Sequence, residues 1–194
     1  AQNHLDWRLT GIDLDAEMAT MSERAARRGG WDNLKFVVGA AEQLMAEQQY
    51  DLIICIDALE HISDDIGLLI KIRKALKPEG YVVLHVPRRR HHQWRWIKAF
   101  SEHTVDGHVG EEYEEDEFRQ LIERAGFRIR ESRQTFGRWG EVSFELNMLV
   151  WKKRWLRNIL ALLTYPVAVP IGYVDTRRPP DRGNAFLAGA QLKN

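Results

Sequence analysis

The chain has 194 residues, and its 28 basic and 28 acidic side chains give a formal net charge of zero. This length allows one domain with a sizeable core and is short for two ordinary domains. Balanced charge gives no argument for a nucleic-acid partner, and 44% apolar with 29% charged residues is typical of an ordinary soluble protein. We therefore expect a single domain over residues 1–194 without a nucleic-acid partner.

The only cysteine, Cys55, excludes a disulfide within the chain and favours a reducing compartment. The N-terminal stretch AQNHLDWRLT has no apolar run of the kind found in a signal peptide. We expect a cytoplasmic protein.

The first half of the chain alternates predicted strands and helices. Strands are predicted over 7–13 and 35–38, and a helix with an acidic first turn and Gly29-Gly30 as its stop lies between them. A second unit of this kind covers 50–87, with strands over 51–56 and 81–86. Its helix starts at Ser63 as N-cap and is stopped by Lys77-Pro78 and Gly80. Such alternation predicts an α/β fold with a mostly parallel sheet and helices on both faces.

The second half is less regular. Residues 88–110 are predicted to form a long loop, followed by a helix over 111–126 and a strand over 127–135. The inner face of that helix is expected to consist of Phe118, Leu121, Ile122 and Ala125. Residues 142–174 are apolar and partly helical, with Pro166 and Pro170 as breakers. A polar loop over 177–184 leads to a closing strand over 185–192.

Polar residues follow two of the predicted strands, where ligands of open α/β sheets bind. Asp13, at the end of the first strand, is suited to accept hydrogen bonds from the hydroxyls of a ribose. The alternative is a solvated carboxylate that begins the next helix, a role that Asp15 fills equally well. His61, in the turn after the strand over 51–56, is the candidate general base. It is otherwise a turn cap or a packed side chain, and Glu60 then only orients the loop.

Two other clusters have simpler explanations. The histidines at 85, 91, 92, 103 and 108 match no metal-binding spacing, so we expect no metal site. The basic and aromatic residues over 88–96 suit a phosphate, an anionic substrate or a membrane surface, or form a solvated loop. The apolar run over 155–174 is too short and too interrupted by proline to span a membrane. We expect it to pack as a core or lid helix, with attachment to a membrane surface as the alternative.

The ordered segments LTGIDLDAEM, FVVGAAEQL, YDLIICIDALEHISD, LKPEGYVVLHVP and HVGEEYEEDEFRQLIERAGF resemble the class I S-adenosylmethionine-dependent methyltransferases, in particular the ubiquinone and menaquinone biosynthesis group. The resemblance covers about residues 5–135. It implies a seven-stranded Rossmann-like sheet with an antiparallel last strand, and S-adenosylmethionine bound at the strand ends. Residues 1–135 would form the cofactor-binding core, 136–184 a variable insertion or lid, and 185–194 the last strand.

The resemblance also assigns the cofactor contacts. Asp13, followed by Leu14, would hold the ribose hydroxyls. Ala40, Ala41 and Glu42 would lie against the adenine, and Ile56 and Asp57 would line the methionine side. The family often carries an acid at the position of Ala40, where this chain offers only backbone contacts.

The sequence contains neither GxGxxG nor GxxxxGK, and only twelve residues precede Asp13. The family's first strand, with its glycine-rich loop, is therefore missing. Because that strand is central, its loss should open the middle of the sheet and leave two strand edges unpaired. We favour an upstream segment that this sequence omits. The alternatives are a strand from another chain and a degenerate protein that no longer methylates.

These observations predict methyl transfer from S-adenosylmethionine to a small or amphipathic acceptor. The competing hypothesis is an inactive, methyltransferase-like binding or scaffold protein. A nicotinamide-dependent oxidoreductase is disfavoured, because EHISD and LKPEG fit methyltransferases better. The sequence leaves the acceptor and the oligomeric state open.

Overall fold

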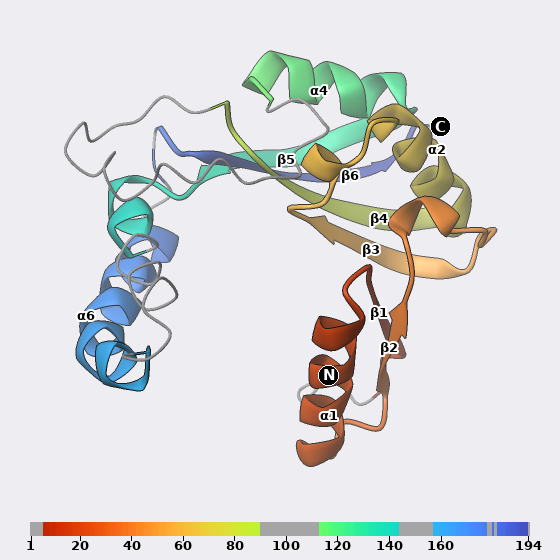
Figure 1. Ribbon diagram of the computed structural model, residues 1–194. Helices are drawn as coiled ribbons and strands as arrows, with labels where there is room; N and C mark the ends of the chain where they lie inside the picture. Colours follow the sequence, from red (N-terminus) through yellow and green to blue (C-terminus); the bar gives the residue numbers. More distant parts are fainter. Residues whose placement is uncertain (1–5, 90–112, 144–156, 178–179, 181, 194) are drawn as a thin grey trace. The chain divides into compact units, whose positions relative to one another are not determined.

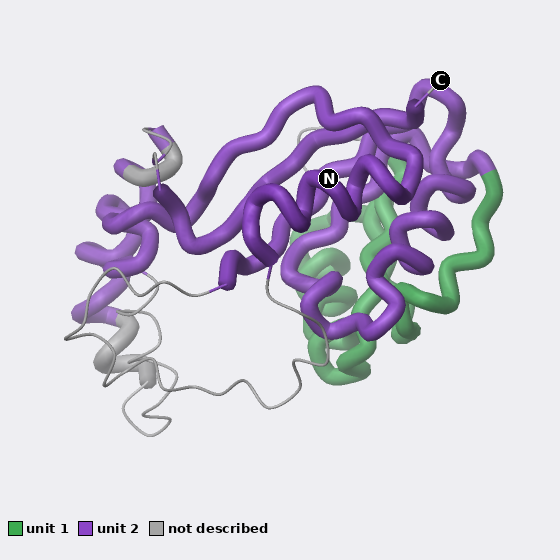
Figure 2. The backbone as a smooth tube through the Cα atoms, turned by 90° about the horizontal axis from the view of Figure 1, so that it is seen from above, with its two compact units in different colours: residues 1–47 green, residues 48–194 purple. Residues whose placement is uncertain are grey.

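The computed structural model describes residues 6–89, 113–143, 157–177, 180 and 182–193 (Figure 1). The chain divides into two compact units, Ala1–Glu47 and Gln48–Asn194, which Figure 2 shows in green and purple.

The first unit is a strand–helix–strand element. It contains β1 (Leu9–Asp13), α1 (Ala16–Arg28), β2 (Leu34–Val38) and the short 3₁₀ helix η1 (Ala41–Gln43). The two strands run parallel, in a register from Leu9 opposite Leu34 to Asp13 opposite Val38. Ala19 and Ala26 of α1 are buried. The strand, helix and strand predicted for this part of the sequence are confirmed.

The second unit contains a four-stranded mixed sheet. Its elements are β3 (Tyr50–Ile56), η2 (Leu59–His61), α2 (Asp65–Ala75), β4 (Leu76–Pro87), α4 (Glu115–Arg124), β5 (Phe127–Thr135), α6 (Arg157–Arg177) and β6 (Ala185–Leu192). The strand order is β3-β4-β6-β5, in which β3 and β4 are parallel and β6 is antiparallel to both of its neighbours. The α/β class and the antiparallel last strand are therefore confirmed.

Helices α2 and α4 lie on one face of this sheet, and the main core lies between them and the strands (Figure 1). The predicted inner face of α4 is confirmed, because each of its four residues is at most 8% exposed. The largest of the side chains below 2% exposure in this core are those of Leu69, Leu76, Val82, Leu84, Val86, Ile122 and Phe127, together with Leu59 of η2.

Among the described residues, each unit has a sheet of its own. Within the described part of the chain β1 pairs only with β2, and β3 pairs only with β4. Both strands of the first sheet therefore have an open edge, as does β3 in the second. The other edge of the second sheet, β5, is protected by its charged residues Arg128, Arg130, Glu131 and Arg133. Strand β3 instead exposes Leu52, Ile54 and Ile56. Because these residues alternate along the strand, their side chains lie on the same face of the sheet.

Two predicted boundaries in the second unit are wrong. The N-cap of α2 is Asp64 and not Ser63, because the Asp64 carboxylate accepts from the backbone N of Gly67. The LKPEG stretch lies in β4 and is not a separate stop, since Leu76 ends the helix by turning directly into extended backbone and pairs with Tyr50.

Helix α6 also differs from the prediction, because it continues through Pro166 and Pro170. The two prolines leave the carbonyl groups of Leu162 and Pro166 without their usual donors. Both of these residues are exposed, so water can bond to the carbonyls. Within the described part of the chain, no helix is long and apolar enough to cross a membrane.

Candidate functional site at the strand ends

One group of candidate site residues lies in the first unit, at the carboxyl ends of β1 and β2. The backbone N of Gly39 donates to the carbonyl of Asp13 over 3.0 Å, which joins the two strand ends. Asp15 is the N-cap of α1, and its carboxylate accepts from the backbone N of Glu17 and Met18. Asp13 therefore does not cap the helix. Its Oδ1 accepts from the backbone N of Asp15 over 2.9 Å, and its side chain stays exposed.

The residues expected near the adenine follow β2 directly. Ala40 precedes η1 and makes no side-chain capping bond, while Ala41 and Glu42 begin that short helix. Leu14 is 76% exposed beside Asp13. The structure thus brings Asp13, Leu14 and Ala40–Glu42 together within the first unit.

A separate group of candidate site residues lies in the second unit, at the carboxyl ends of β3, β4 and β5. Ile56, the last residue of β3, is 58% exposed. Asp57 follows with φ of +48°, a left-handed conformation that is uncommon outside glycine. Its backbone N donates to the carbonyl of His85 over 3.1 Å. Its Oδ1 lies 2.7 Å from Nδ1 of His85, whose Nε2 lies 2.9 Å from Oγ1 of Thr135.

These three side chains form a hydrogen-bonded group, called here the carboxyl-end triad, of Asp57, His85 and Thr135. The prediction contained Asp57 as a cofactor contact, and His85 only as one of the histidines judged unsuited to a metal. Thr135 was not predicted. The triad joins residues 28 and 50 positions apart. The one hint in the sequence is that each residue lies at a predicted strand end.

Glu60 of η2 lies beside this group and is only 3% exposed. Its Oε2 has no hydrogen-bond partner among the described residues. Burial raises the pKa of the Glu60 carboxyl, and the nearby Asp57 raises it further, while a bond from its own backbone and the charges of His61 and His85 lower it less. Burial also raises the pKa of the neighbouring Cys55 thiol to about 11, so this cysteine is not a nucleophile at neutral pH.

The raised pKa of Glu60 predicts a pH-dependent stability. The folded state holds the Glu60 proton more tightly than the unfolded state does. Protonated Glu60 therefore stabilises the fold, and this stabilisation is fully present below the ordinary pKa of glutamate. That contribution is lost as the pH rises towards the raised pKa. We therefore expect the free energy of unfolding of the wild type to fall relative to that of Glu60→Gln as the pH increases from 4 to 7. Urea denaturation at each pH measures this difference. The exposed Glu123→Gln controls for the loss of a surface carboxylate, and parallel curves for wild type and Glu60→Gln would contradict the assignment.

His61, the predicted base, is the last residue of η2 and is exposed. The structure places it on the same short helix as Glu60. Of the other histidines in the predicted cluster, those at 91, 92, 103 and 108 lie outside the described residues. Within the described residues, no three histidine, cysteine or acidic side chains are arranged to hold a metal ion.

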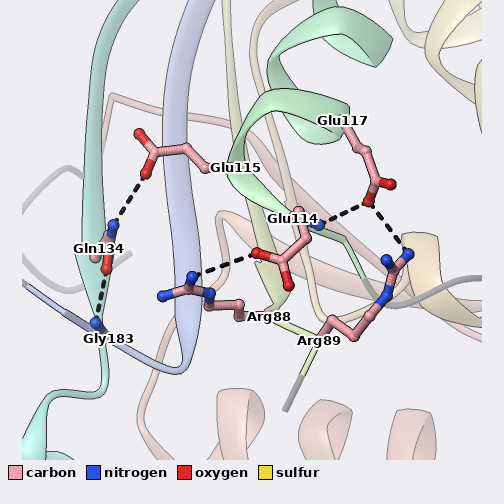
Figure 3. A network of polar contacts seen from close by, with 7 residues as sticks. All are labelled: Arg88, Arg89, Glu114, Glu115, Glu117, Gln134 and Gly183. Carbon is pink, nitrogen blue, oxygen red and sulfur yellow. Dashed lines mark hydrogen bonds and ion pairs between the residues drawn. The ribbon is translucent and has the colours of Figure 1, made fainter. Parts of the chain in front are cut away.

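Next to the triad, a polar network joins the end of β4 to the start of α4 (Figure 3). Arg88 forms an isolated bridge with Tyr113, and Nη2 of Arg88 lies 3.3 Å from Oε2 of Glu114. Arg89 pairs with Glu117, which also accepts from the backbone N of Glu114 and completes the capping box of α4. Gln134, which precedes the triad residue Thr135, bonds to Glu115 and accepts from the backbone N of Gly183. The network therefore fixes the end of β5 against α4 and the start of β6.

The fold is of the α/β class, in which ligands bind at the carboxyl ends of the strands. Residues 2–132 match the methyltransferase domain family, which is more than half of the chain. The chain belongs to this family, as the resemblance in the sequence implied.

Curated relatives are similar over part of the chain. A ubiquinone biosynthesis O-methyltransferase of Aliivibrio fischeri (strain MJ11) is 32% identical over 76 residues, which is 38% of this chain and 32% of that protein. The protein of the same name from Salmonella paratyphi A is 27% identical over 99 residues, which is 50% of this chain and 40% of that protein. The match therefore spans less than half the length of each relative.

Solved structures show the same fold at low identity. The (4+2)-cyclase SpnF superposes with a TM-score of 0.63 and 15% identity over 96% of this chain and 67% of its own. A Haemonchus contortus phosphoethanolamine N-methyltransferase, bound to phosphomonomethylethanolamine and S-adenosylhomocysteine, superposes with a TM-score of 0.63 and 19% identity. The superposition covers 96% of this chain and 44% of that one. A Burkholderia thailandensis 1,6-didemethyltoxoflavin-N1-methyltransferase superposes with a TM-score of 0.55 and 17% identity, over 96% of this chain and 62% of that one. Because one of the three is a cyclase, the fold alone does not determine the reaction.

Proposed function

We propose that this protein is an S-adenosylmethionine-dependent methyltransferase that methylates an oxygen atom of a small or amphipathic acceptor. Membership of the methyltransferase domain family supports the reaction class. The observation that carries the proposal is the end of β1, where Asp13 keeps an exposed carboxylate because Asp15 caps the following helix. An acid in this position suits a ribose with two free hydroxyls.

The chemistry of the residues at the strand ends fits this cofactor. In the first unit Asp13 would hold the ribose hydroxyls, beside Leu14, and Ala40, Ala41 and Glu42 would contact the adenine. In the second unit Ile56 and Asp57 would line the methionine side. When bound, S-adenosylmethionine supplies a methyl group on a sulfonium, whose C–S bond breaks as the acceptor oxygen bonds to the methyl carbon.

The acceptor class rests on the relatives, which are named for ubiquinone biosynthesis and for O-methylation. We propose that residues 1–135 bind the cofactor, that the variable insertion over 136–184 contributes to the acceptor site, and that residues 185–194 complete one domain. The buried single Cys55 fits a cytoplasmic location. Two histidines, His61 and His85, are candidates for taking up the proton of the acceptor.

The test is a calorimetric titration of S-adenosylhomocysteine into the product of the complete gene. We expect saturable binding, and we expect Asp13→Ala to weaken it by roughly 10- to 100-fold. This range corresponds to about 1.5–3 kcal/mol for hydrogen bonds to a charged group.

Asp15→Ala is the matched control, because it removes a neighbouring carboxylate that caps α1. It should lower helix stability by about 1 kcal/mol and leave the affinity for S-adenosylhomocysteine close to that of the wild type. Equal losses in the two variants would exclude Asp13 as the ribose acid. No binding by the wild type would favour the inactive binding or scaffold protein.

A further inference from the structure

His85 is held in one orientation by the two hydrogen bonds of the carboxyl-end triad. It is 7% exposed, and its ring packs at a tilt of 60° against that of Phe136, with 5.9 Å between the ring centroids. A carboxylate can only accept hydrogen bonds, so the proton of the neutral imidazole lies on Nδ1, directed at Asp57. Nε2 is then an acceptor, and the Thr135 hydroxyl donates to it. This is the tautomer in which an imidazole can take up a second proton through Thr135.

The triad lies where ligands of such a sheet bind. Its members come from the carboxyl ends of three different strands, β3, β4 and β5, all of which point to the same edge. Asp57 at one end of the triad is exposed and Thr135 at the other is half-buried, while His85 between them is buried. A small acceptor at this edge can therefore reach the Thr135 hydroxyl but not the imidazole.

The backbone at both ends of the triad is held in an uncommon conformation. The described residues other than glycine with positive φ are Gln48, Asp57 and Phe136. Of these, Asp57 belongs to the triad and Phe136, with φ of +53°, directly follows Thr135. Backbone of this kind costs about 1–3 kcal/mol per residue and gathers at functional sites. A buried histidine that needed only to satisfy its hydrogen bonds would not require both ends to be held in this way.

We propose that Thr135, His85 and Asp57 form a proton relay, in which Thr135 contacts the acceptor and His85 receives the proton during methyl transfer. This inference rests on the proposed function and replaces His61 with His85 as the base. As the acceptor oxygen bonds to the methyl carbon, its proton passes to Oγ1 of Thr135, and the proton of Thr135 passes to Nε2 of His85. His85 ends as an imidazolium paired with the Asp57 carboxylate. Thr135 is the catalytic residue, because it contacts the acceptor. His85 and Asp57 act through Thr135, since His85 takes up its proton and Asp57 pairs with the resulting imidazolium.

The surroundings of His85 suit this role. Asp57 after β3 carries the charge nearest to the ring, and the buried Glu60 on η2, with His61 beside it, also interacts electrostatically. From β6 the ring faces its register partner Leu187, and from beyond β5 it faces Phe136, neither of which titrates. Proton uptake by His85 is therefore balanced by carboxyl groups on one side and shielded from water on the other.

The first test does not depend on turnover. We would record ¹⁵N–¹H correlation spectra of the imidazole groups in the complete gene product, with and without S-adenosylhomocysteine. We expect His85 to carry its proton on Nδ1, and Thr135→Val to shift the resonance of Nε2 while Thr135→Ser leaves it in place. A proton on Nε2 of the neutral ring would overturn the relay, whatever the activity of the protein.

The second test measures methyl transfer to a catechol probe, 3,4-dihydroxybenzoate. We expect Thr135→Val and His85→Gln each to lower kcat by roughly 10²- to 10⁴-fold, the usual contribution of general base catalysis. Thr135→Ser should recover most of the rate, and the decline of kcat at acid pH should disappear in His85→Gln. Ser132→Ala on the same strand is the control. Affinity for S-adenosylhomocysteine should stay within about twofold in all of these variants.

The outcomes separate the two proposals. A wild type that does not bind S-adenosylhomocysteine contradicts the proposed function, and the spectra still decide the tautomer. A wild type that binds and methylates, with His85→Gln unimpaired or with the loss found in His61→Ala instead, overturns the relay and leaves the proposed function intact.

Discussion

Phe127→Ala is expected to lower the free energy of unfolding of the second unit by about 3–5 kcal/mol, the range typical of truncating a buried aromatic side chain. Phe127 is the first residue of β5 and is completely buried. It pairs with Leu192 of β6 and follows Gly126, whose φ of +90° turns the chain from α4 into the strand. Its ring therefore lies where α4, β5 and β6 meet. Removing it leaves a cavity that α4, β5 and β6 cannot fill by moving towards one another, because the interior is close-packed.

The measurement is urea denaturation, followed by circular dichroism. Phe136→Ala is the matched control, because the same ring is removed at a position that is 40% exposed. It should cost less than about 1.5 kcal/mol, since less apolar surface returns to water. If Phe127→Ala lowers the free energy of unfolding by less than about 1 kcal/mol, the packing of the Phe127 ring is not important for the stability of this unit.

The parts of the fold that the sequence predicts well are those that depend on local pattern. The inner face of α4 follows from apolar residues at helical spacing, and β5 and β6 have the bounds that alternation and the adjacent turn residues predict.

The errors arise where tertiary structure competes with local preference. Ser63 is as good an N-cap residue as Asp64, and only the observed backbone decides between them. Proline usually breaks a helix, because it lacks the N–H donor and its ring crowds the carbonyl four residues before it. Helix α6 nevertheless continues through Pro166 and Pro170, with Leu162 and Pro166 exposed. The sequence pattern alone therefore does not decide whether a proline ends a helix.

The candidate site shows the same division. Asp13 and Asp57 were predicted because each follows a predicted strand, and their cofactor contacts stay predictions. The structure adds that Asp15, and not Asp13, is the N-cap of α1. The triad was missed because it depends on strand order. His85 and Thr135 meet only because β6 lies between β4 and β5 and brings their carboxyl ends to one edge.

Gly183→Ala is expected to disturb that edge directly and to lower the free energy of unfolding by about 1–3 kcal/mol, as overpacking usually does. A Cβ at Gly183 would lie 2.1 Å from the backbone carbonyl oxygen of Thr135. Backbone cannot rotate away as a side chain can, so either β5 or the start of β6 must move. The backbone N of Gly183 also donates to the side chain of Gln134. The movement should therefore displace both Gln134 and Thr135 at the end of β5.

The same variant links the fold to the proposed relay. We expect Gly183→Ala to shift the imidazole resonances of His85, because a displaced Thr135 can no longer donate to Nε2 over 2.9 Å. Gly39→Ala is the control, since a Cβ there has no atom nearer than 3.8 Å and the change adds only an ordinary contact. Unchanged stability and unchanged His85 resonances in Gly183→Ala would show that the end of β5 adapts freely. A strand end that adapts so easily would not hold Thr135 in the position that a proton relay requires.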